Sequence, residues 1–242
     1  KNILIVGKQK DIEAYKILFD DGAKFGMKIN YILQSIPKGI PEAFILSEKY
    51  IKNKNVCLIL GDNFFYGNGL SLKLINLKKK NKGATILGFK VQNPSDYGVI
   101  KLKKNKIINI IEKPKTSISN YAVTGLYFFD KNVVDYTYKL KPSKRGELEI
   151  TDLNKIYLSY NKLNYEILDR GFTWLDTGNP EYLLKATQFV NILEERQGVK
   201  IACIEEIAYR NNWISKKDLK FITKKMNASN YKDYLVDLVI KG

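Results

Sequence analysis

Residues 56–63 read Val-Cys-Leu-Ile-Leu-Gly-Asp-Asn, an apolar run that ends in a glycine and a carboxylate. The run 56–60 is typical of a strand buried on both faces of a parallel sheet. Ligands of open parallel sheets lie beyond the carboxyl ends of the strands, so Asp62 stands where a metal or a phosphate would be handled. Position alone equally allows Asp62 to cap the next turn.

The segments before this run alternate between strand and helix patterns. Residues 3–6 and 29–33 predict strands, and residues 11–19 and 41–50 predict helices. This alternation indicates an α/β fold, with a Rossmann-like, mixed but mostly parallel sheet that carries helices on both faces.

The pattern changes beyond residue 96, where short and closely spaced strands predict a small β insertion over 97–130. Residues 204–240 have helical periodicity throughout. We therefore expect a core domain over 1–195 and a C-terminal helical region over 196–242.

Composition excludes several classes of protein. The 242 residues include no histidine, which rules out a Ser-His triad or a His-ligated metal. Two cysteines are too few for a disulfide scaffold, and no apolar stretch approaches the roughly 20 residues of a membrane span. We expect a cytoplasmic protein with no membrane partner, whose chemistry depends on carboxylates, lysines and a hard metal.

The net charge of +16 suggests a polyanionic partner, but its distribution argues against one. Only four of the 41 basic residues are arginine, and the densest run, residues 78–82, contains no aromatic side chain to stack a base. A solvated helix end explains that run better than a nucleic-acid surface, so we expect no nucleic-acid partner.

A second strand-end carboxylate is Asp176, in the sequence Thr-Trp-Leu-Asp-Thr-Gly of residues 173–178. Asp62 and Asp176 could converge on one Mg²⁺, which takes one or two carboxylates besides substrate phosphates and water. The alternative is that Asp176 caps the helix expected near residue 181.

Other polar positions are ambiguous when taken singly. Lys113 could hold a phosphate and Glu112 sugar hydroxyls, or the two could belong to surface ion pairs. Gly98, after Tyr97, allows close backbone approach to a ligand but also a tight turn. The amide of Gln34 could pair with the imide edge of a pyrimidine.

The order of these blocks is more informative. It comprises Gln34 and Gly39, Leu-Gly-Asp-Asn at 60–63, Tyr97-Gly98, Ile-Glu-Lys-Pro at 111–114, Arg-Gly-Glu-Leu-Glu-Ile-Thr-Asp at 145–152, Trp-Leu-Asp-Thr-Gly at 174–178, Glu-Arg-Gln-Gly at 195–198 and Glu-Glu-Ile-Ala-Tyr-Arg at 205–210. Over essentially its whole length the chain resembles the bacterial glucose-1-phosphate thymidylyltransferases, sugar-phosphate nucleotidyltransferases.

The resemblance implies a Mg²⁺-dependent transfer of a thymidylyl group from dTTP to glucose 1-phosphate. The products would be dTDP-glucose, on the route to dTDP-rhamnose and other dTDP-sugars, and pyrophosphate. Such a reaction needs positioning and charge neutralisation rather than an imidazole. The resemblance also implies a homotetramer and inhibition by a dTDP-sugar end product.

Residue by residue, the resemblance assigns the metal to Asp62 and Asp176 and the sugar phosphate to Lys113. It assigns thymine to Gln34 and Gly39. The residues implied to line the glucose site are Tyr97, Gly98, Glu112 and the backbone of Val123. Those implied for a second, regulatory nucleotide site are Tyr66, Gly67, Arg170, Glu206, Ile207 and Arg210.

One departure is large, because the family's first strand and its glycine-rich, phosphate-cradling loop have no counterpart after Lys1. We therefore expect a fragment of an active enzyme and predict that a polypeptide starting at Lys1 is inactive alone. The alternatives are a noncatalytic subunit that retains sugar-nucleotide binding and a basic binding protein. Within the enzyme class, UTP in place of dTTP also stays open.

Overall fold

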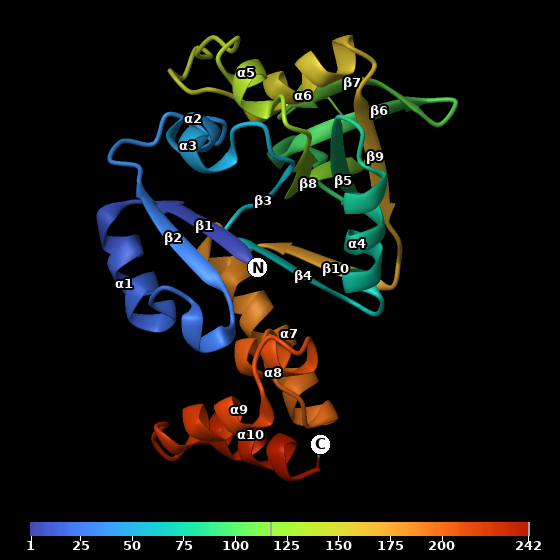
Figure 1. The fold of residues 1–242 in the computed structure, drawn as a ribbon. Helices are drawn as coiled ribbons and strands as arrows, with labels where there is room; N and C mark the ends of the chain where they lie inside the picture. Colours follow the sequence, from blue (N-terminus) through green and yellow to red (C-terminus); the bar gives the residue numbers. More distant parts are fainter. Residues whose placement is uncertain (117, 242) are drawn as a thin grey trace. The chain divides into compact units, whose positions relative to one another are not determined.

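The computed structural model describes residues 1–116 and 118–241 (Figure 1). The chain divides into two compact units, Pro37–Ala186 and a second unit that combines Lys1–Ile36 with Thr187–Gly242. This division differs from the expected boundary at residue 195. The N-terminal segment belongs with the C-terminal helices because Phe25 is buried in one apolar cluster with Leu219 and Leu235.

The unit Pro37–Ala186 is built on a mixed sheet. Its strands, in spatial order, are β7 (Lys106–Glu112), β6 (Gly98–Lys103), β8 (Tyr121–Phe129), β5 (Ala84–Lys90) and β9 (Leu163–Leu168), and β3 (Val56–Ile59) also pairs with β8. β5 and β9 pair in parallel, whereas β6, β3 and β5 are each antiparallel to β8. The α/β class is confirmed, with fewer parallel pairs than the sequence predicts.

One expectation about a strand needs correction. β3 does not lie between two parallel neighbours, because it pairs antiparallel with β8, and Cys57 and Ile59 on its second face are exposed. The short strands expected over 97–130 are present as β6, β7 and β8, which belong to the same sheet as β5 and β9. β8 is a central strand of the sheet, and Phe129 at its end is fully buried.

Helices cover one face of this sheet. Alternate β8 side chains such as Tyr127 and Phe129 pack on that face against α2 (Glu42–Leu46), α5 (Val133–Thr137) and α6 (Ile150–Ser159). Tyr157 of α6 is completely buried there. Each such side chain contributes about 1.5–3 kcal/mol through burial. The short helix α3 (Glu48–Ile51) follows α2, in the region where the sequence predicts a single helix.

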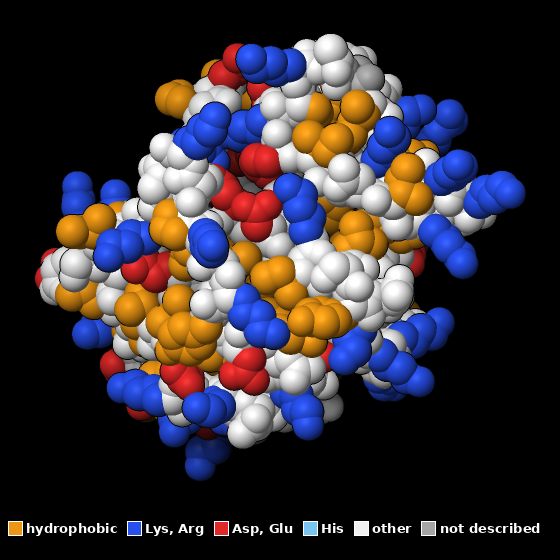
Figure 2. All heavy atoms as spheres, turned by 90° about the horizontal axis from the view of Figure 1, so that it is seen from above, with side chains coloured by type: hydrophobic (Ala, Val, Ile, Leu, Met, Phe, Trp, Pro, Cys, Tyr) orange, Lys and Arg blue, Asp and Glu red, His pale blue; other side chains and the backbone are white. Residues whose placement is uncertain are grey.

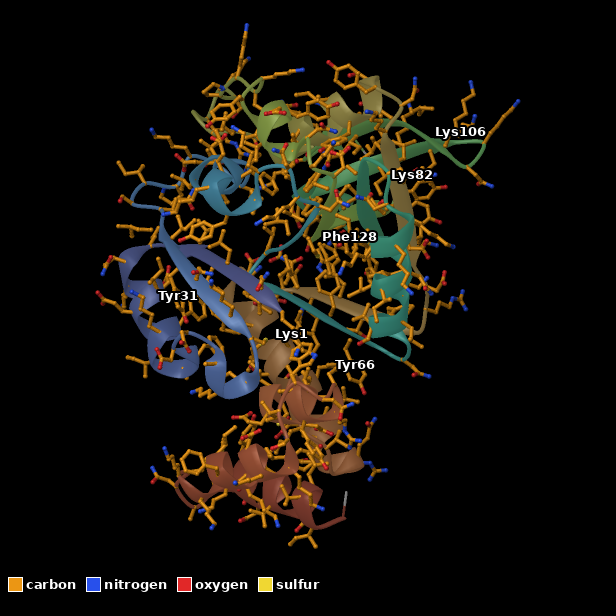
Figure 3. All side chains as sticks on the ribbon, viewed as in Figure 1. Lys1, Tyr31, Tyr66, Lys82, Lys106 and Phe128 are labelled. Carbon is orange, nitrogen blue, oxygen red and sulfur yellow. The ribbon has the colours of Figure 1, made fainter. Side chains whose placement is uncertain are left out.

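The opposite face packs against α4 (Leu70–Lys80) and a two-stranded ribbon. Phe128, labelled in Figure 3, clusters there with Leu126, Leu87 and Leu168, and α4 adds two partly buried leucines. The ribbon consists of β4 (Asn63–Gly67) and β10 (Phe172–Asp176), which run antiparallel with Asn63 opposite Asp176 and Gly67 opposite Phe172. The sheet face therefore supports a ribbon that begins directly after Asp62.

The other unit has its own small core. β1 (Asn2–Gly7) pairs in parallel with β2 (Lys28–Leu33), next to α1 (Gln9–Phe19) and a turn of 3-10 helix at Ala23–Phe25. The helices α8 (Ile204–Arg210), α9 (Lys216–Lys224) and α10 (Asn230–Lys241) confirm the predicted helical tail. α9 starts with a reciprocal capping box between Ser215 and Asp218. α7 (Pro180–Gln197) precedes them in the chain.

The surface charge is dispersed. Figure 2 shows Lys and Arg side chains spread over the face in view, with Asp and Glu between them. Lys78, Lys79 and Lys80 are exposed in the last turn of α4, which confirms a solvated helix end, and Lys106 extends from the β6–β7 turn in Figure 3. None of the helices formed by residues 1–116 and 118–241 has the length and apolar character that crossing a bilayer demands.

Candidate active site

Asp62 and Asp176 meet at one end of the β4–β10 ribbon. Asp176 is the last residue of β10 and lies opposite Asn63, the residue after Asp62. Thr177 secures the junction, because its backbone N–H and its hydroxyl both donate to the Asp62 carbonyl, at 2.7 and 2.8 Å. Two aspartates that are 114 positions apart in the sequence are thus adjacent in the fold.

The space between the two carboxylates is open. A Cβ atom built on Gly178 would lie 3.1 Å from Asp176 Oδ1 and 3.3 Å from Asp62 Oδ2. Both oxygens therefore face a point that any larger residue at position 178 would fill. Gly178 donates its own N–H to Asp176 Oδ1 at 3.0 Å, which fixes the direction of that carboxylate.

The residues present fit a hard cation held partly by substrate. Within residues 1–116 and 118–241, no lysine or arginine forms an ion pair with either aspartate. No cluster of three acidic or cysteine side chains suited to a metal occurs in the described chain either. Two carboxylates with no cationic partner suit Mg²⁺, which keeps water and phosphate as its remaining ligands.

An aromatic wall stands beside Asp176. The ring of Tyr97 packs edge to face against Trp174 of β10 at a centroid distance of 5.1 Å, and Phe89 approaches Trp174 at 6.0 Å. Burial, together with the negative charge of Asp176, raises the pKa of Tyr97 to about 12. The phenol therefore keeps its proton at neutral pH and can donate a hydrogen bond beside the carboxylates.

A second polar group forms where β6, β7, β8 and α6 meet. The Thr151 hydroxyl donates to Glu112 Oε2 at 2.5 Å, and both atoms lie 3.2 Å from where a Cβ on Gly98 would be. Val123 of β8 lies 3.9 Å from the same point. The absence of a side chain at Gly98 thus leaves room in front of a carboxylate, and the structure brings Gly98, Glu112 and Val123 together as the sequence predicts.

Lys113 follows Glu112 directly. Its backbone N–H donates to the Tyr97 carbonyl at 3.0 Å, and its φ of 41° turns the chain sharply after β7. The side chain is exposed and makes no ion pair with another described residue. Lys113 is therefore fixed at its backbone while its ammonium group is available to an anion.

The two residues expected at thymine have different surroundings. Gly39 has a φ of +98°, and a Cβ there would lie 2.0 Å from the Leu148 carbonyl oxygen. Its local role is thus a close packing against the segment that leads into α6. Gln34 directly follows β2 and donates its backbone N–H to the Gly7 carbonyl at 2.8 Å. Gln34 belongs to the other compact unit, so its role at thymine stays a prediction.

The residues expected at a regulatory site fall into two groups. Tyr66 and Gly67 end β4, and Arg170 precedes β10 by two residues, so these three lie at the ribbon end remote from Asp62 (Tyr66 is labelled in Figure 3). Gly67 follows Asn63 by four residues, so the two ends of the ribbon are about 13 Å apart, at about 3.3 Å per residue along a strand.

The second group lies on α8. Glu206 accepts hydrogen bonds from Arg210 Nε at 2.6 Å and from the Tyr234 hydroxyl at 2.5 Å, and Ile207 is 43% exposed. Arg210 also lines a cavity of about 990 Å³, together with Lys200 and residues of α7 and α10. Whether this cavity belongs to a regulatory site stays a prediction.

Three further residues of the site were not singled out from the sequence. Asn63 bonds the Asp62 carboxylate, Trp174 packs on Tyr97, and Thr151 bonds Glu112. All three stand inside the quoted blocks 60–63, 145–152 and 174–178. The sequence therefore contained a clue, because neutral residues inside a block that resembles the family can support the charged residues of the same block.

Comparison with known proteins defines the class. The sequence profile of the family described as Nucleotidyl transferase matches residues 1–192. The chain therefore belongs to the nucleotidyl transferase family. A glucose-1-phosphate thymidylyltransferase of Neisseria gonorrhoeae is 44% identical over 242 residues, which cover all of this chain and 84% of that protein. A relative of the same name from Xanthomonas campestris is 41% identical, over 82% of its length.

Solved structures agree. A Bacillus anthracis protein assigned as a glucose-1-phosphate thymidylyltransferase, in complex with sucrose, is 35% identical with a TM-score of 0.69, over 77% of this chain and 74% of that one. A UDP-glucose pyrophosphorylase with bound UDP-glucose shares the fold at 17% identity, with a TM-score of 0.63 over 78% of this chain and 97% of that chain. The resemblance inferred from the sequence is thereby confirmed.

Proposed function

We propose that this protein transfers the thymidylyl group of dTTP to glucose 1-phosphate, giving dTDP-glucose and pyrophosphate. A phosphate oxygen of glucose 1-phosphate would bond to the α-phosphorus while the bond to pyrophosphate breaks and its electron pair leaves with pyrophosphate. The names of the relatives support this reaction. The observation that carries it is the meeting of two aspartates that form no ion pair within the described residues, beside the packed rings of Tyr97 and Trp174.

Asp62 and Asp176 are proposed to hold Mg²⁺. A cation there supplies charge neutralisation for the phosphates of the nucleotide. The residues of this chain contribute by orienting the groups that bind the cation and the substrates. The Gly178 and Thr177 contacts keep the two carboxylates directed at one place, and Lys113 is proposed to hold the phosphate of the sugar.

The glucose moiety is proposed to lie against Gly98 and Val123, with Glu112 accepting from its hydroxyls. Thr151 supports this role, because its hydroxyl occupies one oxygen of Glu112 and leaves the other to a ligand. Tyr97, with its raised pKa, would donate a hydrogen bond from a protonated phenol. Gln34 and Gly39 are proposed to recognise thymine, Gln34 through its amide side chain.

We further propose that the protein forms a homotetramer and that a dTDP-sugar end product inhibits it. The proposed regulatory residues are Tyr66, Gly67, Arg170, Glu206, Ile207 and Arg210. The cavity of about 990 Å³ beside Arg210 supports this proposal, because its volume lies in the range of small-molecule sites. A cytoplasmic location stays a prediction.

The decisive experiment incubates the purified protein with Mg²⁺, glucose 1-phosphate and either dTTP or UTP, and separates the products by ion-exchange chromatography. We expect dTDP-glucose and an equal amount of pyrophosphate, both abolished by EDTA, whereas product formed by a polypeptide that starts at Lys1 would overturn the prediction that such a polypeptide is inactive alone. Faster turnover of UTP would contradict the thymidylyl assignment. Calorimetric binding of dTDP-glucose without any turnover would favour the noncatalytic alternative.

A further inference from the structure

The side chain of Asn63 joins three segments at the aspartate pair. Its Nδ2 donates to Asp62 Oδ1 at 2.8 Å. Its Oδ1 accepts from the backbone N–H of Gly125 in β8 at 2.8 Å and from Trp174 Nε1 in β10 at 2.6 Å. We propose that Asn63 is a positioning residue that fixes the Asp62 carboxylate toward the cation. This inference rests on the proposed role of Asp62.

The direction of the amide is determined by its partners. A backbone N–H and an indole N–H can only donate, so two donors converging on one end of the Asn63 side chain require an oxygen there. The NH₂ end must then face Asp62. Rotating the amide by 180° would bring its NH₂ group against the N–H donors of Gly125 and Trp174. Asn63 therefore presents a donor to Asp62 because β8 and β10 leave it no other orientation.

β8 also restrains the amide by direct contact. A Cβ on Gly125 would lie 2.5 Å from Asn63 Cγ and 2.6 Å from its Oδ1. Glycine inside a strand weakens it, and it often marks a place where another group approaches closely. Gly125 allows the amide to lie directly on the β8 backbone, while Trp174, only 6% exposed, holds it from β10.

The two oxygens of the Asp62 carboxylate have different surroundings. Oδ1 accepts the hydrogen bond from Asn63, whereas Oδ2 lies beside the space next to Gly178 that Asp176 Oδ1 also borders. A carboxylate already turned toward a cation loses little rotational freedom on binding it, and partners of metal ligands typically change metal affinity 10- to 100-fold.

The test compares Asn63→Ala with Asn81→Ala. Asn81 is a matched control because it is also a half-buried amide that both accepts and donates: it accepts from Thr85 Oγ1 at 2.8 Å and donates to the Gly83 carbonyl at 3.0 Å. Mn²⁺ binding is titrated by electron paramagnetic resonance, and unfolding is followed in urea. We expect Asn63→Ala to weaken Mn²⁺ binding about 10-fold or more and Asn81→Ala to leave it unchanged.

A kinetic measurement separates positioning from general damage. If Asn63 orients a metal ligand, raising the Mg²⁺ concentration should restore most of the kcat of Asn63→Ala, whereas a misfolded site would not recover. Mn²⁺ affinity within twofold of the unmodified protein would overturn the proposal. If Asn63→Ala does not fold, Trp174→Phe decides, because it removes the indole donor to Asn63 Oδ1 and keeps an aromatic ring at this position; weakened Mn²⁺ binding with intact folding supports the proposal, and unchanged binding overturns it.

Failure of the proposed function gives a different result. An unmodified protein that makes no dTDP-glucose but binds Mn²⁺ in an Asn63-dependent manner would refute the reaction and support the positioning role. An unmodified protein that binds no Mn²⁺ would overturn both the metal assignment to Asp62 and the role of Asn63.

Discussion

Carboxylates have different kinds of partner in two regions of the molecule. On the β4–β10 ribbon, Asp62 and Asp176 are held by neutral donors and no ion pair to either is present in the described chain. In the C-terminal helices, Glu194 pairs with Lys200 at 2.6 Å and Glu206 with Arg210 at 2.6 Å. Carboxylates with a structural role are thus paired with a lysine or an arginine of the chain, whereas the two carboxylates expected to bind a cation have no such partner among the described residues.

The largest effect should come from removing one charge of the aspartate pair. Asp62→Asn or Asp176→Asn keeps the side-chain shape, yet turnover should fall by about 10²–10³-fold or more, as when a key electrostatic group is removed. The urea midpoint should stay near that of the unmodified protein, because neither charge stabilises an internal partner. Glu181→Gln, on an exposed pair with Lys185, serves as the control. Full activity in either aspartate variant would establish the capping interpretation.

Filling the space between the carboxylates tests the same region without changing charge. Gly178→Ala places a methyl group within 3.3 Å of both aspartates, so Mn²⁺ affinity should fall about 10- to 100-fold. Gly171→Ala is a matched control, since a Cβ there meets no atom within 4 Å. Equal Mn²⁺ affinities for the two variants, measured by electron paramagnetic resonance, would place the cation elsewhere.

The helical region should respond in stability rather than in metal binding. Tyr231 donates to Oε2 of the buried Glu205 at 2.5 Å, and Tyr231→Phe leaves that carboxylate without this donor. We expect a loss of about 2 kcal/mol in the free energy of unfolding, with Mn²⁺ affinity unchanged. Tyr15→Phe, on a partly exposed ring, should cost far less. An unaltered urea midpoint for Tyr231→Phe would show that the buried carboxylate has other support.

The smallest effect concerns acid pH. Burial raises the pKa of Glu194, but hydrogen bonds from Lys200 and the Ile201 N–H outweigh this and lower it below its ordinary value of 4.5. The resulting stability is present above that value and is lost as the pH falls through the lower folded pKa. Glu194→Gln should therefore flatten this acid dependence, by less than about 1 kcal/mol for a partly exposed pair. Glu195→Gln is the control, because it leaves the Glu194–Lys200 pair in place. If Glu194→Gln loses stability at acid pH as steeply as Glu195→Gln does, the assignment is contradicted.

Much of the fold follows from the sequence because its signal is local. The strands at 3–6 and 29–33 and the helical pattern over 204–240 are confirmed as β1 and β2 and as α8, α9 and α10. The strand that ends at Asp176 was expected and is present as β10, but its pairing with β4 was not predicted, because two five-residue strands 105 positions apart carry no local signal of each other. Partner choice is likewise nonlocal, which is why the antiparallel setting of β3 was missed.

The site divides in the same way. Asp62, Asp176, Glu112 and Lys113 stand out because a charged side chain at the end of an apolar run can only cap a turn, form an ion pair or bind a ligand. Asn63, Thr151 and Trp174 do not stand out in the sequence, because the role of a neutral amide, hydroxyl or indole depends on which atoms it contacts in the fold. The packing of Gly39 on Leu148 could not be foreseen either, because a contact between segments over a hundred residues apart leaves no trace in either one alone.

The register of the ribbon limits how this region can evolve. Side chains on a strand alternate between faces, so losing or gaining one residue in β4 would send every following side chain to the opposite face. Trp174 would then face a residue other than Phe65 across the ribbon, and Asn63 would no longer stand opposite Asp176. Segment 63–67 should therefore keep its length, whereas the exposed turn at 103–106 is where related chains should differ by insertions.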